Sequence, residues 1–169
     1  MNISEMLLPE FDQEMANTRN LLLRVPANKS DYRPHEKSMI LGRLAGHAAE
    51  LPSLVAMIVD TEFLDLKAMM SEGHQPLVSS SADELVGTFD KNVKSARGAL
   101  VRATDEHLSR TWSLQLGEQV IASAPRWQMI RSMCMNHLIH HRAQLGVYLR
   151  LNNIPLPAMY GPSADEGGL

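Results

Sequence analysis

The segment NHLIHHRAQL, residues 136–145, carries the clearest structural signal in this 169-residue chain. His137 and His141 stand four residues apart, which places both imidazoles on one face of a helix, one turn from each other. At this spacing two imidazoles can bind the same metal ion. His140 points to a different face, so we expect it at the surface or supporting a ligand from outside the coordination sphere.

The helix that contains this segment is expected to extend in both directions. Pro125 suits its first turn, whereas Pro155 and Pro157 prevent its continuation beyond about Leu151. Apolar and histidine positions recur at steps of three and four residues along it. This inward stripe comprises Ile130, Cys134, His137, His141, Gln144 and Tyr148.

Stripes of the same period predict two more helices. One runs from about Ser4 to Val25 and ends at Pro26; the other begins after Ser81, which forms a capping box with Glu84. The first stripe is Leu7, Phe11, Met15, Thr18, Leu22 and Val25. The second is Leu85, Phe89, Val93, Ala96 and Leu100.

A fourth stripe, in the second helix of the chain, places a histidine on an apolar face. Ser38 is a suitable N-cap for this helix, and Pro52 within it removes a backbone hydrogen bond and predicts a bend close to His47. The stripe continues without interruption through Ile40, Leu44, His47, Leu51, Leu54 and Ile58.

The height of His47 along its helix agrees with a site shared with the last helix. At about 1.5 Å per residue, His47 lies roughly 24 Å from the C-terminal end of the second helix, and residue 139 roughly 21 Å from the start of the last. If the two helices are antiparallel, the three rings of His47, His137 and His141 share one level. If they are parallel, the levels differ by about one turn or slightly more.

Imidazoles on apolar faces require partners, because burial of a polar group without a hydrogen bond costs several kcal/mol. Either a metal ion or neighbouring side chains and water can satisfy these rings. The pattern is not the H-E-x-x-H motif of zinc proteases, since Leu138 stands where that motif has its glutamate. The histidines at positions 35, 74 and 107 fall in or near expected loops and are predicted to be solvated.

Composition excludes several functional classes. The net charge of −3 arises from scattered acids and bases, so we expect no nucleic-acid partner. We also expect no membrane span or signal peptide, and hence a cytoplasmic protein. The single cysteine, Cys134, cannot form an internal disulfide. Thr111 to Ile121 alternates weakly and predicts a short hairpin or an irregular excursion, within one all-α domain spanning residues 1–169.

The segment at 136–145, the following Tyr148-Leu149-Arg150 and the Tyr160 to Glu166 stretch closely resemble the end of DinB-like bundle proteins. Ser38-Met39 leading to His47 is similar to the second helix of the same family, so the resemblance covers nearly the whole chain. It implies an up-down-down-up four-helix bundle with the second and fourth helices antiparallel, in agreement with the height estimate. It also implies that the metal ligands are His47, His137 and His141.

Three imidazoles suit zinc or nickel and leave coordination positions open. Cys134, one turn before His137, would close the site as a fourth ligand, or else is a small core thiol. Glu50, one turn beyond His47, would bond a ligand ring, accept a proton, or lie at the surface as an ordinary acid.

The site leaves three candidate functions, the first of which the resemblance implies. Family members that resemble this chain include thiol-dependent S-transferases and isomerases, which favours metal activation of a low-molecular-weight thiol. The alternatives are a non-catalytic metal-binding stress or interaction bundle and a metal-dependent hydrolase with Glu50 as its base. A homodimer is the family expectation. The stretch from Tyr160 to Glu166 either folds back over the bundle end or brings Asp165 and Glu166 to substrate or a neighbouring subunit.

Overall fold

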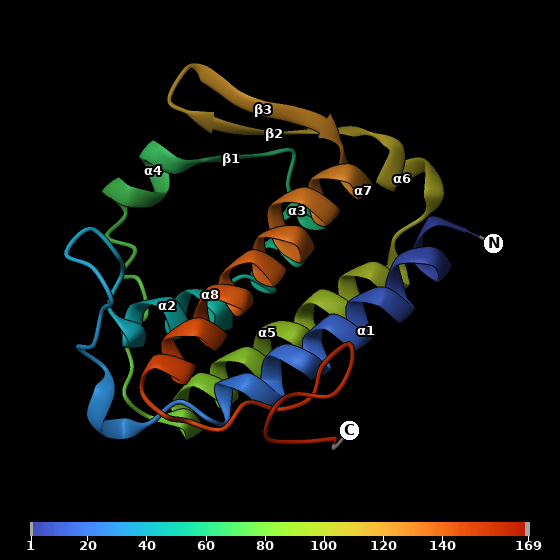
Figure 1. Cartoon of the computed structure of the whole chain (residues 1–169). Coiled ribbons are helices and arrows are strands. Elements are labelled where there is room, and N and C mark those ends of the chain that lie inside the picture. Colours follow the sequence, from blue (N-terminus) through green and yellow to red (C-terminus); the bar gives the residue numbers. More distant parts are fainter. Residues whose placement is uncertain (1, 168–169) are drawn as a thin grey trace.

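A computed structural model describes residues 2–167 as a mostly helical chain with one small sheet (Figure 1). The helical elements are α1 (Ile3–Leu22), η1 (Ala27–Lys29), α2 (Leu41–Glu50), α3 (Ser53–Asp60), α4 (Leu66–Ser71), α5 (Ala82–Arg102), α6 (Asp105–Ser109), α7 (Arg126–Met129), η2 (Ile130–Asn136) and α8 (His137–Leu151). The strands are β1 (Phe63–Asp65), β2 (Thr111–Leu116) and β3 (Gln119–Pro125). The prediction of helices at all four stripes is therefore correct, but the chain is not all-α.

The two long helices α1 and α5 lie side by side, and both begin with side-chain caps (Figure 1). Asn2 and Glu5 form a reciprocal capping box at α1. At α5 the Ser81 side chain accepts from the Glu84 backbone, as predicted, but the Glu84 carboxylate bonds the Ser79 hydroxyl instead of closing the box. The described core contains the predicted apolar positions of both helices, including Leu7, Phe11, Met15, Leu85, Phe89, Ala96 and Leu100.

The predicted second helix is divided into two. α2 ends at Glu50 and α3 begins at Ser53, because Pro52 has no N–H with which to continue the hydrogen-bond ladder. The prediction of Ser38 as its N-cap is wrong. Ile40 is the N-cap residue instead, and its side chain makes no capping hydrogen bond. Carbonyls of the preceding loop accept the first N–H groups of the helix: Leu41 N–H donates to Tyr32 at 2.7 Å, and Gly42 N–H donates to Ser30 at 2.9 Å.

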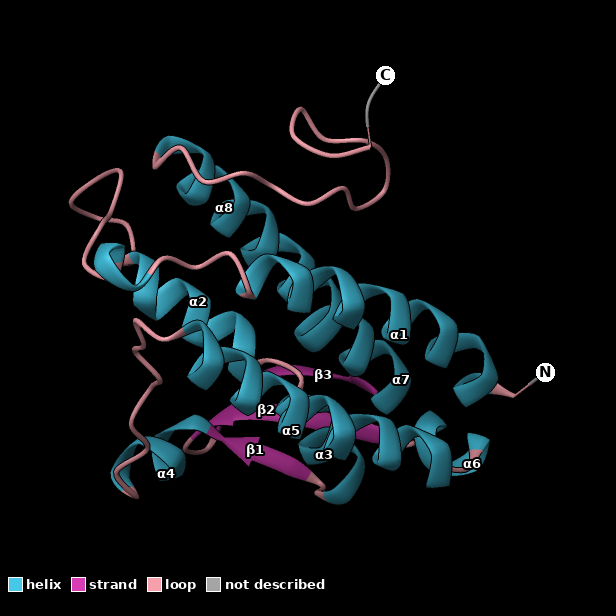
Figure 2. Ribbon diagram, turned by 90° about the horizontal axis from the view of Figure 1, so that it is seen from below, coloured by secondary structure: helices cyan, strands magenta, loops and turns pink. Residues whose placement is uncertain are grey.

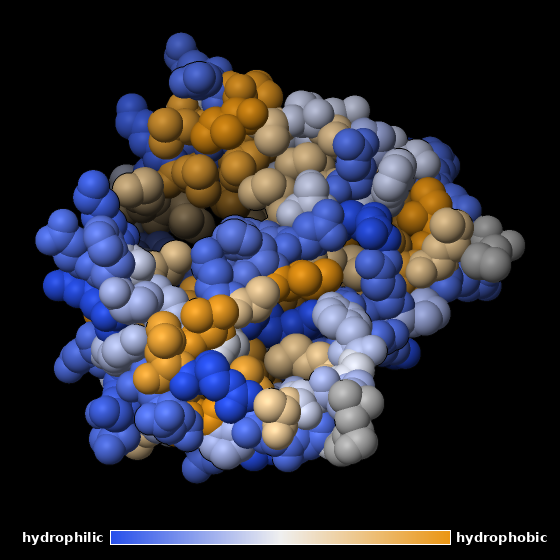
Figure 3. All heavy atoms as spheres, viewed as in Figure 1, coloured by the Kyte–Doolittle hydropathy of each residue, from blue (hydrophilic) through white to orange (hydrophobic). Residues whose placement is uncertain are grey.

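The Thr111 to Ile121 region forms the predicted hairpin, and a third strand joins it. β2 pairs antiparallel with β3, and β1 pairs parallel with β2, with Leu64 opposite Leu114 (Figure 2). The buried guanidinium of Arg126 donates to the carbonyls of Ile58, Thr61 and Thr111, which fixes the sheet against the end of α3. Leu116, Val120 and Ile121 are exposed near the turn of the hairpin. Figure 3 shows hydrophobic residues gathered over this part of the molecule, above a hollow in the surface.

The last helix is not α-helical throughout. α7 is followed by the π-helical segment η2 over Ile130–Asn136, and α8 begins at His137. Pro125 is the N-cap residue of α7 and not part of its first turn. Asn152 is the C-cap of α8, in agreement with the end predicted near Leu151.

The C-terminal stretch folds back over the bundle, which is one of the two arrangements expected for it. Asp165 pairs with Arg150, and Glu166 pairs with Arg24. The Tyr160 hydroxyl donates to Glu14, which forms a buried ion pair of 2.6 Å with Arg142. Within residues 2–167, no helix combines the length and the apolar character needed to cross a bilayer.

Candidate metal centre

Three imidazoles from two helices meet at one point between α2 and α8. His47 lies in the last turn of α2, while His137 and His141 occupy the first two turns of α8. The Nε2 atom of His137 is 3.4 Å from that of His47 and 2.9 Å from that of His141. One nitrogen from each ring lies within 4.8 Å of the others, which is close enough for a single ion. The structure thus brings together the three predicted ligands.

The outer nitrogens of the two α8 rings are held by acceptors. His137 Nδ1 lies 3.3 Å from the Met133 carbonyl, and His141 Nδ1 lies 2.8 Å from the Gln144 side-chain oxygen. An acceptor at Nδ1 places the ring proton there and leaves the Nε2 lone pair facing inward. Two such lone pairs 2.9 Å apart repel each other, and a cation between them relieves that repulsion. The donor set therefore fits a divalent metal ion.

The third ring has a different neighbour. His47 Nδ1 lies 3.4 Å from Nη2 of Arg43, a residue of the preceding turn that the sequence pattern does not single out. A guanidinium can only donate, so this contact differs from those made by the α8 rings. Gln144, predicted on the inward stripe, is exposed and reaches His141 only with its side-chain end, which also contacts His140.

Burial keeps the three rings neutral at physiological pH. Desolvation lowers the pKa of His47 to about 4, with smaller contributions from His141, Arg43 and His137. Desolvation is also the largest cause of the lowered pKa values of His137 and His141. Neutral imidazole is the form that binds metal, so the cluster does not need to lose protons at pH 7 before an ion enters.

The lowered pKa of His47 predicts a pH dependence for the metal-free protein. Between pH 6.5 and about 4 the unfolded chain binds a proton at this residue and the folded chain does not. The free energy of unfolding therefore falls as the pH is lowered through this window, by a contribution on the order of 1–3 kcal/mol. Urea unfolding of chelator-treated protein should show that His47→Gln gains stability relative to wild type over this range. A difference independent of pH would contradict the prediction.

Two other candidate residues, Cys134 and Glu50, do not join the three-histidine cluster. The Cys134 thiol donates to the Leu51 carbonyl at 3.3 Å, and burial raises its pKa to about 12. Glu50 uses both carboxylate oxygens elsewhere, on Arg43 at 2.9 Å and on the Leu77 backbone N–H at 2.6 Å. Among residues 2–167, no fourth histidine, cysteine or carboxylate joins the group. The coordination sphere offered by the protein is open.

The remaining histidines lie outside the cluster. His140 is exposed, as predicted, with its ring centroid 4.9 Å from that of His141. His35 and His74 are exposed, in agreement with the sequence. His107 is a correction, because it is half-buried in α6 with Nε2 2.7 Å from the Val59 carbonyl.

The comparisons with known proteins place this chain in one family. The model of the DinB family matches residues 1–167, so the chain belongs to the DinB family. A solved DinB-like protein from Bacillus cereus is 20% identical, with a TM-score of 0.69 over 92% of this chain and 97% of that one. The DinB-like protein YjoA from Bacillus subtilis is also 20% identical, with a TM-score of 0.67 over 90% and 96%. No curated protein matches the chain.

Proposed function

We propose that this DinB-family protein holds one divalent ion, zinc or nickel, through His47, His137 and His141, and uses it in the chemistry of a small ligand. The observation that carries the proposal is the convergence of three imidazole nitrogens within 4.8 Å with no fourth protein ligand among the described residues. When bound, such an ion supplies Lewis acidity to a molecule at its open positions.

The ligand that we propose is a low-molecular-weight thiol, which makes the protein a metal-dependent thiol S-transferase. The chain itself contributes neutral rings of fixed orientation: the Met133 carbonyl and Gln144 keep the Nδ1 protons of the α8 histidines on the outside. His141 is only 7% exposed and His47 and His137 are partly buried, so the donor nitrogens are partly shielded from water. A charge-neutral, half-buried ligand set favours an anionic partner such as a thiolate.

The two alternative functions find less support in the contacts. A closed structural site requires Cys134 as the fourth ligand, but its thiol is turned to the Leu51 carbonyl. A hydrolase with Glu50 as general base requires a free carboxylate, but both oxygens of Glu50 already accept hydrogen bonds. A non-catalytic protein with an open metal site is the outcome that a conjugation assay distinguishes.

The test is a conjugation assay on protein loaded with zinc or nickel. The thiols are glutathione, bacillithiol and mycothiol, and the acceptor is an aryl halide. We expect the wild type and the control His74→Ala, which removes an exposed imidazole outside the cluster, to accelerate conjugation, and His141→Ala to fall to the uncatalysed rate. Equal rates for His141→Ala and wild type would contradict metal-centred chemistry. Metal binding without conjugation of any thiol would leave a binding protein and remove the transferase assignment.

A further inference from the structure

The side of α2 next to the metal centre is covered by a distant part of the chain. The connection that follows α4 passes along α2 before α5 begins (Figures 1 and 2). Its Ser79 N–H lies 3.4 Å from the Gly42 carbonyl, and Leu77 lies against Gly46. We call residues 77–79 the strap.

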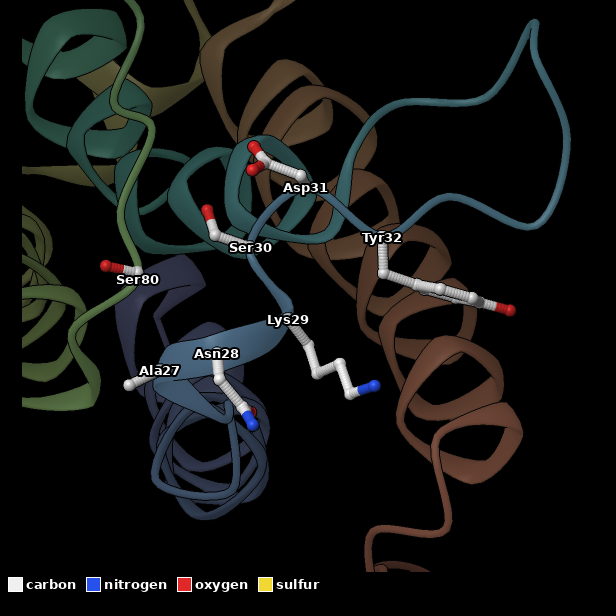
Figure 4. Close-up of a pocket in the computed structure, with 7 residues that line it drawn as sticks. All are labelled: Ala27, Asn28, Lys29, Ser30, Asp31, Tyr32 and Ser80. Atoms are coloured by element: carbon white, nitrogen blue, oxygen red, sulfur yellow. The ribbon is translucent and has the colours of Figure 1, made fainter.

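Two glycines on one face of α2 make room for the strap. A Cβ atom at Gly46 would stand 2.1 Å from the Leu77 carbonyl oxygen, and one at Gly42 would stand 2.7 Å from the Ser79 carbonyl oxygen. Because both obstacles are backbone atoms, any other residue would displace the strap. Gly42 also lies against Ser30 of the 27–32 loop. This loop and Ser80 line an open hollow of about 510 Å³ (Figure 4).

Arg43 and Glu50 hold the strap through hydrogen bonds to the backbone of Leu77. Nη1 of Arg43 donates to the Leu77 carbonyl at 3.1 Å and to Glu50 at 2.9 Å, and the Leu77 N–H donates to the other oxygen of Glu50 at 2.6 Å. Both side chains are only 23% exposed, so the pair is shielded from solvent more than the surface ion pairs of the chain. The carboxylate thus fixes the guanidinium and the Leu77 backbone in one closed ring of hydrogen bonds.

The same guanidinium stands directly behind a metal ligand. Its Nη2 atom lies 3.4 Å from Nδ1 of His47, on the side of the ring opposite the nitrogen that faces His137. Glu50 therefore acts on His47 in two ways. It ties the Arg43 guanidinium, which as a donor at Nδ1 favours the proton on the inward Nε2, to itself and to Leu77, and it neutralises a positive charge that would otherwise oppose the entry of a cation.

We propose that Glu50 and Arg43 are positioning residues of the metal centre, in which Glu50 and the strap at residues 77–79 hold the Arg43 guanidinium and balance its charge behind His47. This inference rests on the proposed metal site. In this role Glu50 neither binds the ion nor acts as a base. It anchors Arg43, which lies behind His47, and balances the charge of the guanidinium. The consequence is that removal of the Glu50 charge affects metal affinity although no ligand changes.

The experiment is a titration with Co²⁺, followed by its visible absorption, of wild type, Glu50→Gln and Asp12→Asn. Asp12 forms the matched control pair, a carboxylate on Arg97 at 3.0 Å between α1 and α5. We expect Glu50→Gln to weaken Co²⁺ binding by about 10- to 100-fold, the usual range for partners of metal ligands, and to shift the absorption band. Asp12→Asn should change neither.

A second variant distinguishes an effect of the unpaired Arg43 charge on metal binding from a loss of folding. Arg43→Met combined with Glu50→Gln leaves no unpaired guanidinium and should regain part of the lost affinity, with circular dichroism reporting the fold of each protein. If Glu50→Gln does not fold, Glu50→Ala, which also removes the charge, takes its place. Affinity within about threefold of wild type for a folded Glu50 variant would overturn the inference while leaving the metal site standing. Failure of wild type to bind Co²⁺ would instead overturn the metal site itself.

Discussion

Replacing His137 and His141 together by alanine should abolish metal binding. Wild-type protein, purified without chelator and reloaded, is expected to contain one equivalent of zinc or nickel by elemental analysis. A single imidazole from His47 cannot hold the ion alone, so the loss in affinity should exceed the 10- to 100-fold typical of changes next to a ligand. The loaded wild type should also unfold at a higher temperature. At an ion concentration 100 times Kd, metal binding should add about 2.7 kcal/mol to the free energy of unfolding.

His74→Ala is the matched control for this experiment, because it removes an exposed imidazole that lies outside the three-histidine cluster. It should keep the full equivalent of metal and the thermal shift. Metal content that is the same in the double variant and in wild type would show that the ion lies elsewhere.

Substitution of Glu14 by glutamine should destabilise the fold strongly. Glu14 is 5% exposed and pairs with Arg142, which is 2% exposed. Arg142 Nη1 also donates to the Glu14 backbone carbonyl at 3.0 Å. Loss of the carboxylate leaves a buried guanidinium without its counter-charge, and such losses cost about 3–5 kcal/mol. Urea denaturation followed by circular dichroism measures the change in the free energy of unfolding.

Asp12→Asn provides the comparison, since it breaks the exposed pair with Arg97. Its cost should stay below about 1 kcal/mol, because solvent screens exposed ion pairs. Similar costs for the two variants would show that Glu14 and Arg142 contribute no more than an ordinary surface pair.

The parts of the structure that the sequence predicts are those set by local periodicity. Apolar residues at steps of three and four mark each long helix, and the same steps place His137 and His141 together. His47 stands out because it occupies an apolar stripe at a matching height. These signals depend only on residues close together in the chain, so the sequence carries them in full.

The parts that the sequence does not predict depend on partners far apart in the chain. β1 is three residues long and exists by pairing with β2, some fifty positions later. Arg142 follows His141 directly, but its partner Glu14 lies in the first helix. Arg43 meets His47 within one helix, but its orientation is set by the Leu77 backbone. No periodicity reports such contacts.

The π-helical segment η2 joins the two ends of the last helix. A π turn closes its hydrogen bond over i→i+5 and so holds about one residue more than an α turn, and each residue of an α-helix advances by about 100°. Deleting one residue within Ile130–Asn136 would therefore let the π turn become an α turn, with α7 and the attached hairpin keeping nearly the same direction relative to the imidazoles. The segment thus holds one extra residue between the hairpin and the imidazoles without turning the two ends of the last helix away from each other.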